Sequence, residues 1–145
     1  MGRGRFRWII CSGSRVVEGE DRERETWLSG QVVDAAIQVH RVLGPGLLES
    51  AYEHCLAYEL GLRGIEVGRQ VALPIRYGDA ELEAGYRLDL VVGRCVVVEI
   101  KAVEAFSRLH QAQILTYLKL SGYRVGLLLN FNVPVLRDGI RRFRR

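Results

Sequence analysis

Apolar residues recur along the chain first at the spacing of helices and then at that of strands, which predicts an α/β fold. From residue 29 or 30 to residue 43 the apolar positions follow a helical spacing, and Gly44-Pro45-Gly46 ends that helix. A second helix is expected from about residue 47 to about residue 62. The remaining expected elements are strands over 67–77, 81–92, 95–102 and 124–130, a helix over 107–120, and a short basic amphipathic tail after Pro134.

The order of these elements is helix, helix, three strands, helix, strand. The last helix-to-strand step favours a mixed sheet that is covered by helices, within one domain over residues 28–145. Residues 1–27 are dense in charge and show no sustained periodicity. We therefore expect them to form a poorly ordered extension, or to contribute a separately attached strand over Phe6–Ile10.

Three charged residues, Asp89, Glu99 and Lys101, interrupt two apolar, β-branched runs that flank a Gly-Arg turn. The two runs predict a hairpin. Because a lone charge is costly to bury, these side chains are expected to be paired, hydrogen-bonded or bound to a metal. A salt bridge to Lys101 would leave one acid over, whereas a divalent cation would satisfy both acids, so we favour a metal site.

The loop length of this hairpin decides whether the two acids share a face. Side chains alternate along a strand, so Asp89 faces Glu99 only if positions of equal parity pair. A two-residue loop would pair Asp89 with Val98, whereas a three-residue loop over Gly93–Cys95 pairs Asp89 with Glu99. We therefore predict an odd-length loop or a bulge, in which Gly93 can take the left-handed conformation.

Two polar pairs lie at helical spacing, Glu49 with Tyr52 on the second helix and Gln113 with Tyr117 on the later one. Each pair has an ordinary structural interpretation. Glu49 suits the positive N-terminus of a helix and Tyr52 suits a core, while Gln113 and Tyr117 suit a surface and a partly buried position. This interpretation does not explain why a tight Gly-Pro-Gly corner should deliver Glu49 to a fixed place.

Composition narrows the classes of protein. Hydrophobic residues make up 48% and charged residues 26%, as in an ordinary soluble globule, and no apolar run approaches the ~20 residues of a membrane span. The three cysteines show no metal-binding spacing. Cys55 and Cys95 lie in apolar patterns as buried thiols, which favours the cytoplasm.

The net charge of +4 is concentrated in arginines near both termini. Basic ends fit a polyanion partner such as a nucleic acid, but charge alone favours a solvated tail that aids solubility. The C-terminal arginines are Arg141, Arg142, Arg144 and Arg145.

On these residues the chain resembles the GxxExxY family, a branch of the PD-(D/E)XK nuclease-like superfamily. The motif that names the family is present as Gly46, Glu49 and Tyr52, and the acids and lysine of the superfamily are present as Asp89, Glu99 and Lys101. The Gln and Tyr that the family carries on its following helix are matched by Gln113 and Tyr117. The resemblance covers roughly residues 30–142, with Leu88 in place of the proline in the superfamily's name.

The resemblance implies a three-layer, restriction-endonuclease-like α/β fold with a mixed central sheet, an α-β-β-β-α-β core and an extra N-terminal helix. It also implies an Mg²⁺ or Mn²⁺ site at Asp89 and Glu99, with the Ile100 carbonyl and Glu49 as further ligands. Lys101 would hold the attacking water or neutralise charge that develops on the phosphate.

The resemblance also implies supporting roles for residues around the acids. Gln113 and Tyr117 would orient Lys101 or contact the backbone of a nucleic acid. Tyr52 would support the site from the second helix, and Arg87, on the face of Asp89, would clamp a phosphate.

The function implied is that of a metal-dependent nuclease acting on phosphodiester bonds of DNA or RNA. One alternative is a non-catalytic nucleic-acid- or protein-binding module that retains the nuclease-like fold, because so small a domain leaves little room for a recognition domain. Another is a scaffold whose acids are an ion-paired relic. A homodimer is expected, since this domain would need a second copy to engage both strands of a duplex.

Overall fold

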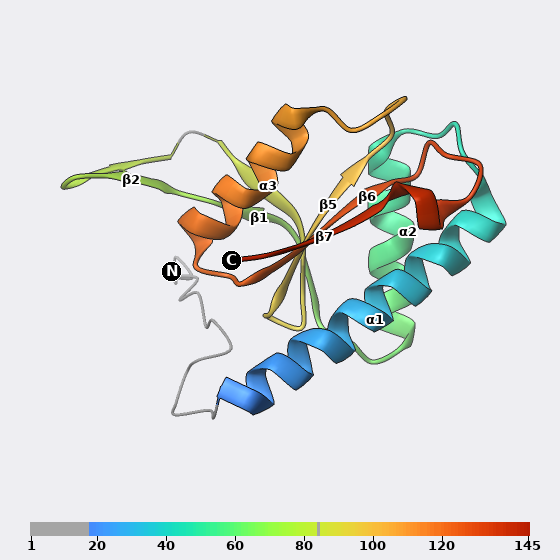
Figure 1. The fold of residues 1–145 in the computed structure, drawn as a ribbon, viewed down its shortest axis with the longest axis horizontal. Helices are drawn as coiled ribbons and strands as arrows, with labels where there is room; N and C mark the ends of the chain where they lie inside the picture. Colours follow the sequence, from blue (N-terminus) through green and yellow to red (C-terminus); the bar gives the residue numbers. More distant parts are fainter. Residues whose placement is uncertain (1–17, 84) are drawn as a thin grey trace, which may run out of the picture.

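The computed structural model describes residues 18–83 and 85–145, and these form three layers. Figure 1 shows α3 on one side of the strands, and α1 with α2 on the other. The elements in chain order are α1 Glu18–Leu43, α2 Glu49–Leu62, β1 Val67–Ala72, β2 Ile75–Tyr77, β3 Ala80–Leu82, β4 Arg87–Val92, β5 Val96–Lys101, α3 Arg108–Ser121, β6 Val125–Asn130, the 3₁₀ helix η1 Leu136–Gly139, and β7 Ile140–Arg144.

The central sheet has five strands in the order β1-β4-β5-β6-β7. Only β5 and β6 run parallel among the neighbouring pairs of this sheet, and the crossover between them is α3. The strands β2 and β3 form a separate antiparallel hairpin that projects from the sheet (Figure 1). The succession α2-β1-β4-β5-α3-β6 is the expected α-β-β-β-α-β core, with α1 as the extra helix, so the predicted fold class is confirmed.

Each face of the sheet has its own hydrophobic cluster, because side chains alternate along the strands. On the face covered by α1 and α2, Leu90, Val98 and Leu127 pack against the two helices. On the face covered by α3, Val91 and Val97 pack with Tyr117 and Leu118. We call these the α1–α2 face and the α3 face.

Two of the expected strands are interrupted. The segment 67–77 breaks after Ala72, where Pro74 lacks the N–H that a ladder needs, and continues as β2. The segment 81–92 breaks before Arg87, next to Gly85, whose φ is 75°. The expected basic tail contains an edge strand, β7, which pairs antiparallel with β6.

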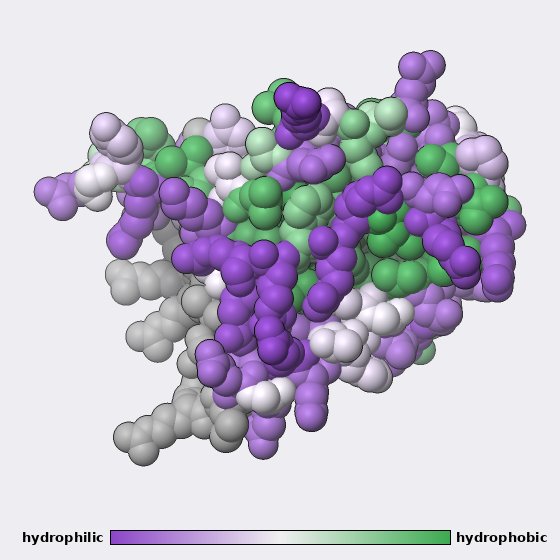
Figure 2. Space-filling model, in the orientation of Figure 1, coloured by the Kyte–Doolittle hydropathy of each residue, from purple (hydrophilic) through white to green (hydrophobic). Residues whose placement is uncertain are grey.

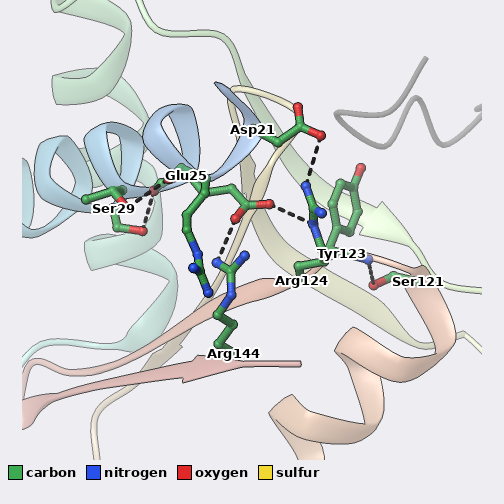
Figure 3. A network of polar contacts seen from close by, with 9 residues as sticks. Asp21, Glu25, Ser29, Ser121, Tyr123, Arg124 and Arg144 are labelled. Atoms are coloured by element: carbon green, nitrogen blue, oxygen red, sulfur yellow. Dashed lines mark hydrogen bonds and ion pairs between the residues drawn. The ribbon is translucent and has the colours of Figure 1, made fainter. Parts of the chain in front are cut away.

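The first helix starts at Glu18 rather than near residue 29, so residues 18–27 are not a poorly ordered extension. Asp21 and Glu25 are buried, and both pair with Arg124 (Figure 3). Hydrophilic side chains dominate the surface over the beginning of α1, below the centre of Figure 2. The expected strand over Phe6–Ile10 lies outside the described residues.

The cysteines differ from the expectation. Cys55 is a free thiol but only half-buried, whereas Cys95 is buried and disulfide-bonded, so its interpretation as a thiol is wrong. The cytoplasmic location therefore stays a prediction. Within residues 18–83 and 85–145, no helix combines the length and apolar character needed to cross a membrane.

Candidate active site

The hairpin between β4 and β5 has the predicted register. Leu90 pairs with Val98, and Val92 with Val96, which leaves a three-residue loop over residues 93–95. Gly93 takes the left-handed conformation with φ 58°, and so does Arg94 with φ 59°. The prediction of an odd-length loop is confirmed. Glu99 shares the α3 face with Val97 and Lys101, whereas Asp89 lines a cleft beside α2.

If this register is continued, Asp89 lies opposite Glu99. Here the backbone N–H groups donate to side-chain carboxylates rather than to carbonyls of the other strand. The Asp89 N–H donates to Glu99 Oε1 at 3.2 Å, and the Ile100 N–H donates to Asp89 Oδ2 at 2.8 Å. Each carboxylate thus accepts an N–H from the opposite strand. These two hydrogen bonds hold the acids side by side at the point where β4 and β5 separate.

Glu99 is the most perturbed acid of the pair. Its side chain is almost fully buried, and desolvation, followed by the charge of Asp89, raises the pKa of Glu99 to about 8. The hydrogen bond from the Asp89 backbone and the charge of Lys101 act in the opposite direction. Glu99 therefore keeps its proton near neutral pH when no cation is present.

Lys101 is held by the helix that covers this face. Its Nζ donates to Gln113 Oε1 at 3.3 Å, and Gln113 Nε2 donates to the Tyr117 hydroxyl at 2.8 Å. Gln113 and Tyr117 lie one turn apart on α3, so the helix aligns them as the spacing predicts. The chain Lys101–Gln113–Tyr117 fixes the lysine beside Glu99.

The corner before α2 is held by Tyr52. Its hydroxyl donates to the Gly44 carbonyl at 2.6 Å and accepts from the Leu47 N–H at 3.1 Å, while its ring stacks on Phe131. Tyr52 thereby fixes the start of α2, where Glu49 is the first residue. The two residues have different tasks, since Tyr52 is fully buried in the core and Glu49 is exposed.

Glu49 reaches the far end of β5. Its Oε1 accepts the Ala102 N–H at 3.1 Å, one residue beyond Lys101. Glu49 therefore meets the same strand as the acid pair, but its expected role as a metal ligand is not part of the described geometry. Arg87, the expected phosphate clamp, donates from Nη1 to the Gln70 carbonyl at 3.2 Å.

Two residues that sequence reasoning did not select, Glu53 and Gln70, complete the site. Gln70 Nε2 donates to both carboxylate oxygens of the buried Glu53, at 3.0 and 2.9 Å, and approaches Asp89 Oδ1 at 3.4 Å. Gln70 has a φ of 49° within β1, a conformation that is strained for a non-glycine residue. The four-residue spacing from Glu49 could have indicated Glu53, whereas the sequence gives no signal for Gln70.

Part of the site, including Glu49 and Asp89 but neither Glu99 nor Lys101, lines a cleft of about 570 Å³ between α2 and the sheet. Three acids line it, and its floor includes Asp89. The lining residues are Leu47, Leu48, Glu49, Ser50, Glu53, Gln70, Asp89 and Ala102.

The donor set fits a hard divalent cation. Mg²⁺ binds oxygen, commonly one or two carboxylates with water completing its shell, and Asp89 and Glu99 supply two adjacent carboxylates. Across residues 18–83 and 85–145, no group of three or more His, Cys, Asp or Glu side chains lies close enough to hold a metal. The structure thus supports a pair of protein carboxylates, with no third acid in place.

Metal binding at this pair should depend on pH. Because the pKa of Glu99 is raised to about 8, a cation must displace its proton at lower pH. We expect the dissociation constant for Mn²⁺ to fall by up to about tenfold per pH unit from about pH 6 to pH 8, and to level off above. Titration calorimetry measures this change, together with the proton released. An affinity that does not change with pH would contradict binding at Glu99.

A comparison with known families agrees with this geometry. The sequence profile of the PD-(D/E)XK nuclease superfamily matches residues 26–143, a range that contains every residue of the site described above. Searches of the curated proteins and of the solved structures found no match. The mixed sheet with its parallel β5–β6 pair is consistent with the restriction-endonuclease-like fold. The chain therefore belongs to the PD-(D/E)XK nuclease superfamily.

Proposed function

We propose that this protein is a metal-dependent nuclease of the GxxExxY branch that hydrolyses phosphodiester bonds of DNA or RNA. One observation carries the proposal. Asp89 and Glu99, each hydrogen-bonded to the backbone of the opposite strand, lie beside a lysine that Gln113 holds in place. A scaffold needs only an ion pair here. A site for phosphodiester hydrolysis needs a second acid, beyond the one in an ion pair, and a positively charged side chain held in a fixed orientation. The two acids and Lys101 meet both needs.

Asp89 and Glu99 would hold the cation, and members of the superfamily typically use divalent metals. A bound Mg²⁺ or Mn²⁺ supplies a water of lowered pKa and polarises the phosphate. The carbonyl of Ile100 would complete the ligand set contributed by β5. Glu49 would act from the rim of the cleft, on a second cation or through a water of the first.

Lys101 would donate from Nζ to the attacking water or to the phosphate oxygen on which charge develops. Gln113 keeps the lysine from swinging into solvent, and Tyr117 in turn orients the Gln113 amide. Arg87 lies at the edge of the site, where a guanidinium could pair with a substrate phosphate.

The test is a cleavage assay on plasmid DNA, single-stranded DNA and RNA with Mn²⁺ or Mg²⁺. We expect at least one substrate to be cut, cleavage to stop with EDTA, and Glu99→Gln to remove it. Glu81→Gln, on the projecting β3, is the matched control because its exposed carboxylate lies outside the site. Nucleic-acid binding without cleavage of any substrate would contradict the nuclease and favour the binding module.

A nucleic acid is the partner that this function requires, and a homodimer remains our prediction for duplex substrates. In a dimer the second copy would place a second acid pair on the opposite strand. Light scattering measures the mass in solution, and a monomer at the concentration used for cleavage would contradict the dimer.

A further inference from the structure

The three arginines of the edge strand β7 occupy three different environments. Arg144 donates from Nη1 to Glu25 Oε2 at 2.7 Å, so it belongs to the structural network of α1. Arg142 pairs with Leu127 on the α1–α2 face, where it lines a groove beside α1. Arg141 pairs with Leu128 and therefore points to the α3 face.

Arg141 lies on the same row of the sheet as the acid pair. Leu128 on β6 pairs both with Glu99 on β5 and with Arg141 on β7. Residues that pair across strands share a face, so Arg141 and Glu99 lie on the same side of the sheet. Two strand spacings separate their backbones by roughly 10 Å.

The Arg141 guanidinium is held in place by its surroundings. Nη1 donates to the carbonyls of Asp138 and Ile140, at 3.3 and 2.8 Å, and the guanidinium lies 6.0 Å from the Phe106 ring centroid. The ring of His110 also meets Phe106, edge-on with the ring centroids 6.3 Å apart. We call these three side chains the Arg141 stack.

His110 adds a donor to the stack. Its Nδ1 accepts the Ser107 N–H at 3.1 Å, within the capping box of α3. Neutral His110 therefore carries its proton on Nε2. The stack thus presents a guanidinium that is pre-oriented on an aromatic ring and an imidazole N–H, which are groups suited to a phosphate.

We propose that the Arg141 stack binds the sugar-phosphate backbone of the strand whose phosphodiester lies at Asp89 and Glu99. This inference rests on the proposed function, because it assumes that the phosphodiester to be cut lies at the acid pair. The ~10 Å between the backbones of Glu99 and Arg141 is short enough for one strand to reach both residues within a few nucleotides. Arg141 would contact a phosphate near the one that is cut.

The test compares neighbouring arginines on opposite faces of one strand. Binding of short fluorescein-labelled single-stranded DNA is followed by anisotropy, in EDTA so that nothing is cut, between about 50 and 200 mM salt. We expect Arg141→Ala to weaken binding by at least about fivefold and to lower the slope of log K against log salt by about 0.7. Arg142→Ala removes the same charge and should stay within about twofold of the unchanged protein.

Further variants separate a local contact from a folding defect. Arg141→Lys keeps the charge and should recover part of the affinity, whereas Phe106→Leu should weaken binding although it removes no charge. Equal losses in Arg141→Ala and Arg142→Ala, unchanged binding in Arg141→Ala, or no binding by the unchanged protein would each overturn the proposal.

The outcome is independent of the cleavage assay. Selective loss in Arg141→Ala from a protein that cuts no substrate would support the stack and contradict the nuclease. If the protein cuts a substrate, but Arg141→Ala and Arg142→Ala bind DNA equally well, the nuclease is supported and the role of the Arg141 stack is contradicted.

Discussion

Lys101→Ala is expected to lower phosphodiester cleavage by at least about 100-fold while leaving the affinity for Mn²⁺ within about threefold. The lysine is not an oxygen ligand, so its removal leaves the carboxylates of Asp89 and Glu99 in place. It does remove a positive charge that lowers the pKa of Glu99. Metal binding should therefore be measured by calorimetry above pH 8, where Glu99 is ionised in the unchanged protein.

The sequence contains one other lysine, which provides the control. Lys119 lies exposed in the last turn of α3, so Lys119→Ala should cut at the normal rate. Gln113→Ala should lower the rate by a smaller factor than Lys101→Ala, because the lysine is still present but no longer oriented. Full activity in Lys101→Ala would show that the lysine takes no part in the reaction.

The acid pair could be predicted from sequence because its geometry is local. Parity along two strands and the length of one loop decide that Asp89 faces Glu99, and both can be counted in the sequence. The same holds for Gln113 and Tyr117, which the period of a helix brings to one face. Local periodicity therefore predicted the central part of the candidate site.

The remaining parts of the site depend on features that periodicity does not encode. Gln70 contacts Glu53 and Asp89 from a left-handed position inside a strand, and no pattern predicts such a conformation for glutamine. The stack at Arg141 requires β7 to be an edge strand of the sheet. The chain after Pro134 was expected only as a basic tail, so its register and facing could not be derived.

The sequence does not predict that α1 begins as early as Glu18, for a related reason. Its first turns are rich in charge, which in an isolated segment indicates exposure. Asp21 and Glu25 are nevertheless buried, because Arg124 and Arg144 come to them from 99 or more residues further along the chain (Figure 3). Long-range ion pairs of this kind leave no trace in the local pattern of hydrophobic positions.

This network leads to the second large expected effect. Glu25 has a side-chain exposure of 2%, and it accepts from Arg124 Nε at 2.9 Å and from Arg144 Nη1 at 2.7 Å. Glu25→Ala would leave two guanidinium groups facing each other without their shared acid. Removing one partner of a buried ion pair costs about 3–5 kcal/mol, and here the lower end applies because both arginines stay near 30% exposed.

We therefore expect Glu25→Ala to lower the free energy of unfolding by about 3 kcal/mol and Tm by about 10 °C, measured by urea and thermal denaturation. Glu23→Ala, exposed two residues earlier on the same helix, is the control and should change stability by less than about 0.5 kcal/mol. Because Arg144 and Arg141 share β7, Glu25→Ala should also loosen the strand that carries the Arg141 stack. Unchanged stability in Glu25→Ala would mean that α1 is held by its apolar contacts alone.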